Sequence, residues 1–178
     1  MEQQKEKDLK AKEAEKKQIS ILRSGNTAAT IKVIDEIRDK GNITILPEIF
    51  EVMLDTEDDE VMEACTTLLN DLNNQEATTF LVAALKNQRY RPVRSALVSS
   101  CWQSGLDYHT QVPLFARLLL REDYATAIEA FTVIENSIGD LSDEEIVQLT
   151  GTLNTGLQEA GDNKKKLIRE MIKVIREY

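Results

Sequence analysis

Few side chains in this sequence are suited to catalytic chemistry. The chain of 178 residues contains one histidine, His109, and two cysteines, Cys65 and Cys101. A catalytic triad built on His109 would need an activated nucleophile, and no Gly-x-Ser-x-Gly turn is present to supply one. A zinc hydrolase would need more histidine or cysteine ligands than the chain has. We therefore expect a protein without enzymatic activity, in which His109 lies at the surface or caps a helix.

The two cysteines each fall on the apolar face of a predicted helix. The chain has no Cys-x-x-Cys pair, so its sequence does not indicate a structural zinc site. We expect Cys65 and Cys101 to be buried thiols in a reducing compartment, and a disulfide between them is the alternative.

Two further patterns resemble ligand-binding motifs without meeting their requirements. Residues 57–60 form a run of four carboxylates, which lacks the alternating oxygen ligands and the glycine of a calcium-binding EF-hand loop. Gly151 and Gly156 have the spacing of a phosphate-binding loop, but Leu157 and Gln158 occupy the positions that require lysine and serine or threonine. We expect neither a metal ion nor a cofactor.

The acidic runs are explained by helix starts. Thr56 is predicted to cap a helix whose first turn carries the carboxylates of residues 57–60, because negative charge is favourable at the positive end of the helix dipole. Ser142 and Glu145 have the spacing of a capping box. Both runs therefore predict where helices begin.

Positive charge is concentrated in the middle of this acidic chain. The net charge is -9, yet the segment 77–121 holds six basic side chains against one acidic side chain. The segments 24–76 and 122–162 on either side are strongly acidic, and the second of them has no basic residue. The middle of the chain is therefore a basic island between two acidic segments.

Two interpretations of this island compete. In the first, its arginines form ion pairs with acidic residues of neighbouring helices, each contributing up to about 1 kcal/mol when exposed. In the second, the island binds a carboxylate or phosphate group of a partner, such as an acidic peptide, because arginine and tyrosine suit such groups. The residues of this hypothetical site are Arg89, Tyr90, Arg91, Arg117 and Arg121.

The aromatic residues near the island also have two interpretations. Trp102 is the only tryptophan, and it lies near the end of a predicted helix, close to Tyr108. We expect the indole to be buried against the turn. A partly exposed aromatic patch of Trp102 and Tyr108, available to a ligand, is the alternative.

A repeat of helices positions all of these residues. The segments 61–73, 76–87 and 92–105 are predicted to be helices, and the first aligns with the third when Val61 is laid over Val93. Paired helices of this length cannot bury their apolar faces alone, so repeats of this period stack on one another around a continuous core.

The repeat continues toward the C-terminus. A further copy aligns with the helix at 92–105 when Ala130 is laid over Ala96, and this alignment also lays Gly139 over Gly105. Gly41, Gly105 and Gly139 are each predicted to end a helix, because glycine is favoured at that position.

The repeat resembles the HEAT family in its shorter bacterial form. The resemblance rests on residues 92–97 (Pro-Val-Arg-Ser-Ala-Leu), with weaker copies at residues 60–65 and 126–131, and it covers about residues 26–139. It implies an all-α, right-handed α-α superhelix of about four helical pairs with capping helices. It also implies that the second helix of each pair, which carries Arg117 and Arg121, faces a concave surface.

The ends of the chain complete the expected organisation. Residues 1–17 are polar and predict a solvated arm or a helix extension, and residues 18–178 predict a single helical-repeat domain. No apolar run is long enough for a membrane span, and no signal peptide is apparent. We expect a cytoplasmic protein.

Binding is the function that these features favour. We expect a scaffold or adaptor that binds another protein or an acidic peptide on the concave helix face. A regulatory subunit of an enzyme complex is the first alternative. Nucleic-acid binding is disfavoured, because the acidic segments would repel phosphates. The sequence leaves the oligomeric state and the identity of the partner open.

Overall fold

The computed structural model describes residues 2–178, with the side chains of Glu6 and of the residues from Leu9 onward. Within this part of the chain every regular element is a helix, and no strand is present. Four short 3-10 helices lie between the longer elements: η1 (Ile43–Ile45), η2 (Gln88–Val93), η3 (His109–Gln111) and η4 (Ile138–Asp140). The ten α-helices of the described chain are α1 (Glu2–Leu22), α2 (Thr27–Lys40), α3 (Leu46–Asp55), α4 (Asp59–Asn70), α5 (Ala77–Lys86), α6 (Arg94–Gln103), α7 (Val112–Arg121), α8 (Tyr124–Ser137), α9 (Asp143–Glu159) and α10 (Asp162–Glu177).

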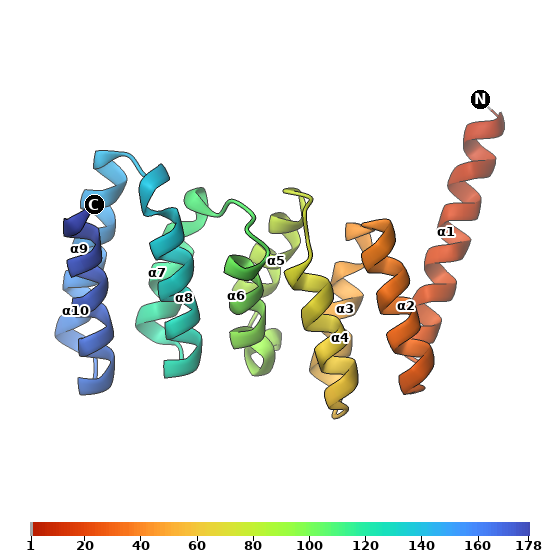
Figure 1. Cartoon of the computed structure of the whole chain (residues 1–178), viewed down its shortest axis with the longest axis horizontal. Helices are drawn as coiled ribbons and strands as arrows, with labels where there is room; N and C mark the ends of the chain where they lie inside the picture. Colours follow the sequence, from red (N-terminus) through yellow and green to blue (C-terminus); the bar gives the residue numbers. More distant parts are fainter. Residues whose placement is uncertain (1) are drawn as a thin grey trace.

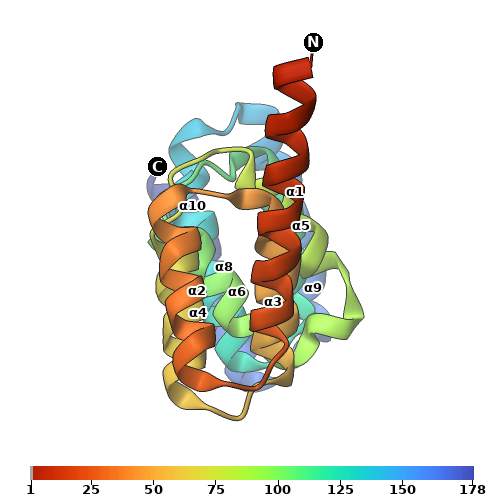
Figure 2. The same ribbon diagram turned by 90° about the vertical axis from the view of Figure 1, so that its right-hand side faces the viewer.

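The helices form two layers that run the length of the molecule. In Figure 1 they follow one another in chain order, with the two termini at opposite ends of the row. The even-numbered helices contact one another in succession, and among the odd-numbered helices α1 contacts α3, α3 contacts α5, and α7 contacts α9. Figure 2, seen along the row, shows the even helices on one side and the odd helices on the other. The apolar core lies between the layers.

Polar side chains cap the starts of three helices of the even layer. The side chains of Asn26, Asp58 and Asp123 accept backbone N–H groups at the starts of α2, α4 and α8. The prediction that Thr56 caps α4 is wrong. Thr56 ends α3, and its hydroxyl accepts the backbone N–H of Asp58, which is the residue that caps the helix. The capping box of Ser142 is confirmed at α9.

Two of the three glycines predicted to end helices do so. Gly41 and Gly105 have φ angles of 65° and 68°, in the left-handed region that glycine adopts without steric cost. The third prediction is wrong, because Gly139 lies inside η4 and has no positive φ. The helix before it, α8, ends at Ser137 without a left-handed residue.

Burial confirms the predicted register of the repeat between α4 and α6. Laying Val61 over Val93 makes Cys65 and Leu69 correspond to Leu97 and Cys101. All four of these side chains are buried, so the two helices present equivalent faces to the core.

Between α6 and α8 the predicted register is wrong by a single position. The buried Ala130 corresponds to the buried Leu97 and not to Ala96, which is only partly buried. The same alignment lays the buried Ile134 over the buried Cys101. The core-facing positions therefore decide the alignment, whereas the predicted one relied on the glycine in η4.

Polar contacts at the period of the repeat join successive pairs of helices. The amide of Asn70 donates to Gln103 Oε1 at 2.9 Å. The side chain of Gln75 donates to the carbonyl of Asp107 at 2.6 Å and accepts the backbone N–H of Asp107 at 3.0 Å. Equivalent points of adjacent repeats are thus held together by hydrogen bonds.

The two ends of the row differ in packing. The first part of α1 extends past its neighbours in Figures 1 and 2, whereas α10 buries Ile168, Met171, Ile172 and Ile175. Along the described chain, none of the helices has the length and hydrophobicity needed to cross a membrane.

Candidate binding groove

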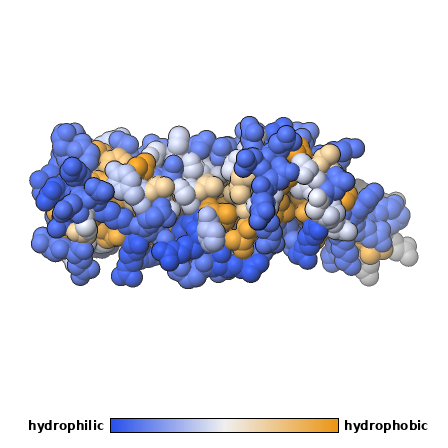
Figure 3. All heavy atoms as spheres, turned by 90° about the horizontal axis from the view of Figure 1, so that it is seen from below, coloured by the Kyte–Doolittle hydropathy of each residue, from blue (hydrophilic) through white to orange (hydrophobic). Residues whose placement is uncertain are grey.

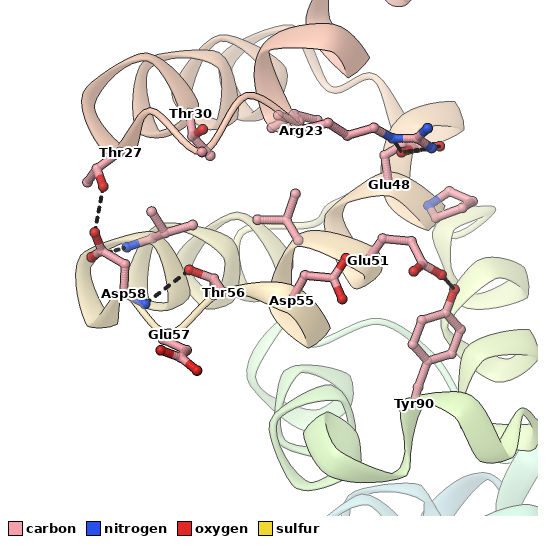
Figure 4. Close-up of a pocket in the computed structure, with 15 residues that line it drawn as sticks. Arg23, Thr27, Thr30, Glu48, Glu51, Asp55, Thr56, Glu57, Asp58 and Tyr90 are labelled. Carbon is pink, nitrogen blue, oxygen red and sulfur yellow. Dashed lines mark hydrogen bonds and ion pairs between the residues drawn. The ribbon is translucent and has the colours of Figure 1, made fainter.

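An open groove of about 1310 Å³ lies on the surface of the described structure. It lies where α1 meets α2 and where α3 meets α4, at the lower ends of these helices in Figure 1. Counted along the chain, α1 and α2 are the first pair of helices, α3 and α4 the second, and α5 and α6 the third, up to α9 and α10 as the fifth. Tyr90 bounds the groove on the side of the third pair (Figure 4). Figure 3 looks onto this lower end, which is mainly hydrophilic with separate hydrophobic spots. The charged residues that line the groove are Arg23, Glu48, Glu51, Asp55, Glu57 and Asp58.

The amphipathic helix α3 builds one wall of the groove. Its buried face, which includes Ile49 and Met53, packs into the core, and this orients Glu48, Glu51 and Asp55 toward the outside. Pro47 lies in the first turn of α3, at a position where a missing N–H costs nothing. The period of the helix therefore gathers three carboxylates on one strip.

Two of the acidic residues on α3 are paired with arginines from neighbouring pairs of helices. Arg23, at the end of α1, donates to Glu48 through Nε at 2.9 Å and through Nη2 at 2.6 Å. Arg89, in η2, donates to Glu51 through Nη2 at 2.5 Å. Figure 4 shows Arg23 and Glu48 meeting at one edge of the groove. In both pairs the arginine is mostly exposed and the carboxylate is partly buried, so solvent screens the pairs and their contributions to stability are small.

Tyr90 completes the environment of Glu51. Its hydroxyl donates to Glu51 Oε1 at 2.7 Å, and its ring meets Phe50 edge-on, with centroids 5.9 Å apart. The hydrogen bonds from Arg89 and Tyr90 hold the pKa of the Glu51 carboxyl below its usual value. Burial and then the bond to Glu51 raise the pKa of Tyr90 to about 12.

The remaining acidic residues leave the groove negative. Asp58 accepts the hydroxyl of Thr27 at 2.6 Å, which lowers the pKa of Asp58 and ties α4 to α2. Asp55 and Glu57 are exposed and form no ion pair within the described residues. Five carboxylates thus face only two arginines, Arg23 and Arg89, so a cationic group is attracted to this groove.

The structure separates the five basic-island residues that the sequence predicts as a site. Arg89 and Tyr90 lie at the groove edge and bind Glu51, as described above. Arg91 is exposed, and its Nε lies 3.3 Å from Glu122 Oε2. Arg117 and Arg121 lie on the exposed side of α7 and form no ion pair in the part of the chain that is described. The first interpretation, pairing between neighbouring helices, therefore describes Arg89 and Arg91.

A second cluster of charges surrounds a buried arginine. Arg94 is only 1% exposed, and its Nη1 donates to Glu122 Oε1 at 2.5 Å. Its Nη2 donates to the carbonyl of Asn87 at 3.0 Å, and Lys164 donates to the carbonyl of Glu122. Residues of the third, fourth and fifth pairs of helices meet here. We call this cluster the Glu122 junction.

The aromatic residues do not form a shared patch. Trp102 is 37% exposed on α6, and its indole N–H donates to Glu129 of α8 at 2.6 Å, so the predicted burial of Trp102 is wrong. Tyr108 is 2% exposed and packs edge-on against Phe115, with centroids 5.7 Å apart, so its place in an exposed patch is wrong as well. A cavity of about 200 Å³ touches both Trp102 and Tyr108.

The candidate catalytic side chains lie in environments that suit structural roles. His109 Nδ1 lies 2.7 Å from Asp107 Oδ1, and this contact raises the pKa of His109. Burial raises the pKa of Cys65 and of Cys101 to about 12, which leaves both thiols protonated and weakly nucleophilic. Among the described residues, no group of three or more acidic, histidine or cysteine side chains is arranged to hold a metal ion.

Comparison with known proteins adds no assignment. No model of a known protein family matches the chain, and no curated protein sequence matches it.

The groove is not predictable from local sequence patterns, because its acidic residues are distant in the sequence from Arg23 and Arg89. One signal was present. Glu48, Glu51 and Asp55 are spaced by three and four positions after Pro47, which places them on one face of a helix. That spacing predicts an acidic strip, but not the hollow beside it.

Proposed function

We propose that this protein is a non-enzymatic adaptor whose acidic groove binds a lysine- or arginine-bearing segment of another protein. The observation that supports this proposal is the groove itself, a hollow of about 1310 Å³ in which five carboxylates face two arginines. The regulatory-subunit alternative would use the same groove to hold an enzyme, so it is a special case of this proposal.

We further propose that the five pairs of helices form a right-handed solenoid of the HEAT type. The layers of successive helices and the hydrogen bonds between equivalent points of adjacent repeats support a stacked repeat. A stacked array presents rigid surfaces along its length, which suits a binding protein better than a catalytic one.

A basic segment fits the groove better than the acidic peptide that the sequence analysis favours. A partner carboxylate that approached Arg89 or Arg91 would have to displace Glu51 or Glu122 from its arginine. Asp55 is exposed and is not engaged in an ion pair with a described residue. Nucleic acid is disfavoured here for the same electrostatic reason, because its phosphates would meet the net negative charge.

The experiment compares a fluorescent helical peptide that carries arginine at every fourth position with the same peptide carrying glutamate. Anisotropy titrations at about 0.05 M and about 0.5 M salt measure the affinity and its screening. We expect the arginine peptide to bind, and to bind more weakly at high salt. The variant Asp55→Lys/Glu57→Lys should weaken binding by about tenfold, because two exposed charge reversals together remove about 1–2 kcal/mol.

The matched control is Asp143→Lys/Glu144→Lys. These residues are exposed acids in the first turn of α9 and do not line the groove. The control makes the same change in net charge, so it should leave the affinity close to that of the wild type. Equal loss in both variants would contradict the groove and indicate attraction to the whole acidic surface.

A further inference from the structure

The third and seventh helices are equivalent elements of the repeat with opposite outer charges. Laying Pro47 over Pro113 makes every buried residue of α3 correspond to a buried residue of α7, as Ile49 does to Phe115. Each of the two prolines lies in the first turn of its helix. Side chains at corresponding positions therefore point out of the odd layer in the same way.

The outward-facing positions of α3 and the corresponding positions of α7 carry opposite charges. In this alignment Glu51 and Asp55 of α3 correspond to Arg117 and Arg121 of α7. The outer face of α3 is therefore acidic at the positions where the outer face of α7 is basic.

The helix between them, α5, is uncharged at the equivalent place. Its buried Leu81 and Leu85 correspond to the buried Ile49 and Met53 of α3. This alignment puts Ala83 of α5 at the place of Glu51. The outer face of the odd layer is thus acidic at α3, uncharged at the middle of α5 and basic at α7.

We propose that this face binds a second copy of the chain about a two-fold axis that runs parallel to the helices and passes by α5. Such an axis reverses the order of the row and keeps the direction of every helix. It places α3 of each copy opposite α7 of the other, with Glu51 and Asp55 level with Arg117 and Arg121. The contact is self-complementary and closed, as expected for a two-fold dimer.

This inference deepens the proposed function, since Glu51 and Asp55 also line the acidic groove. In the absence of another partner, the basic segment that approaches the groove is α7 of the second copy. Partner binding and self-association then compete for the same carboxylates.

The helix at the axis is suited to a close approach. The outward residues Thr79 and Ala83 of α5 are small and uncharged. Two α5 helices can therefore approach each other closely at these positions, and the long arginine side chains of α7 would extend to the acids of the other copy.

The size of the face limits the strength of this contact. A helix of about three turns is about 15 Å long, and three neighbouring helices are about 30 Å wide together. The face thus offers roughly 450 Å² per copy, or about 900 Å² in total, which is less than the ~1,200 Å² at which stable interfaces begin. We expect a weak, reversible dimer that salt dissociates, with a dissociation constant at least about tenfold higher at about 0.5 M than at about 0.05 M salt.

The experiment is a charge exchange followed by sedimentation velocity. One variant carries Arg117→Glu/Arg121→Glu, and the other carries Glu51→Arg/Asp55→Arg. Each variant has one sign of charge at these positions of both helices, so it should be monomeric at low salt. An equimolar mixture pairs the acidic α7 of one variant with the basic α3 of the other, and it should dimerise.

The matched control changes the same number of charges away from the face. The variant Asp143→Arg/Glu144→Arg, with its changes on α9, should dimerise like the wild type.

Several outcomes would overturn the inference. They are a wild type that stays monomeric at low salt, single variants that dimerise as well as the wild type, and a mixture of folded variants that does not associate. Circular dichroism of each variant establishes that it is folded before the result is used.

The same variants separate this inference from the proposed function. The Arg117→Glu/Arg121→Glu chain keeps the acidic groove, so it should bind the arginine peptide at least as tightly as the wild type. Peptide binding without dimerisation would overturn the inference and retain the adaptor. Dimerisation by charge exchange without peptide binding would retain the inference and restrict the groove to self-association.

Discussion

Two carboxylates, Glu51 and Glu122, each hold arginines from a neighbouring pair of helices, but their surroundings differ. Glu51 lies at the edge of the open groove, and its partner Arg89 is mostly exposed. Glu122 is 11% exposed, and its partner Arg94 is 1% exposed. The same type of ion pair therefore has different consequences in the two regions. Burial makes the pair at the Glu122 junction a structural contact between helices, whereas the pair at Glu51 is screened by solvent and leaves the groove accessible.

The helices are also packed more tightly around the Glu122 junction than around Glu51. Beside the Glu122 junction, the side chain of Leu120 lies against Gly156 of α9 so closely that a Cβ atom would overlap it. Beside Glu51, the space between the first two pairs of helices remains open. An open groove and a closed joint can thus be built from one repeat, and the difference lies in whether neighbouring side chains fill the space between pairs of helices.

The largest expected effect is at the buried arginine. Arg94→Ala should lower the free energy of unfolding by about 3–5 kcal/mol, because Glu122 would be left without its buried partner. Chemical denaturation measures this change. The double variant Arg94→Met/Glu122→Leu, which removes both charges, should recover most of the loss. A loss below about 1 kcal/mol in the single variant would contradict the structural role of the junction.

A pair of glycine substitutions in α9 tests the close packing. Gly151→Ala should raise the free energy of unfolding by about 0.5–1 kcal/mol, since the added Cβ meets open space and alanine favours the helix. The free energy of unfolding of Gly156→Ala should be about 1–2 kcal/mol lower than that of Gly151→Ala, because the added Cβ displaces the side chain of Leu120. Equal gains in thermal or chemical denaturation would show that α7 and α9 are not tightly packed.

A smaller effect is expected at the groove edge. Tyr90→Phe removes the hydrogen bond to Glu51 and keeps the ring against Phe50, so it should cost about 0.5–1.5 kcal/mol of stability. Denaturation in urea measures the loss. A cost as large as that of Arg94→Ala would mean that the groove edge is as closed as the junction, which would remove the contrast between them.

The smallest effect is at Arg89, and it depends on pH. Arg89→Ala should lower the stability near neutral pH by less than Tyr90→Phe does, because an exposed ion pair contributes little. The folded pKa of Glu51 is lowered from its ordinary value of 4.5, chiefly by Arg89, so this contribution is complete above that value. The stabilisation by the Arg89–Glu51 pair is lost as the pH falls below the ordinary pKa of Glu51 and then through its lower folded pKa. Unfolding of wild type and variant should therefore converge in acid, and a constant difference would contradict the assignment.

The sequence predicts some of the residues at the edge of the groove. Arg89 and Tyr90 were predicted as binding residues, and both lie at the edge of the groove, but with Glu51 of their own chain as partner. The groove wall formed by Arg23 and Glu48 was not predicted, because these residues are distant in the sequence and belong to different helices. No local pattern connects them.

The amino-acid sequence by itself determined the helices and their repetition. The capping box of Ser142 and Glu145 and the alternation of apolar and polar faces act over one or two turns, so they are readable along the chain.

The tertiary structure alone decided which arginine is buried and which space stays open. Arg89 and Arg94 lie five residues apart in the basic island, and their exposure depends on how closely adjacent pairs of helices dock. That closeness depends on side chains that are far away in the sequence, such as Leu120 where it packs against Gly156.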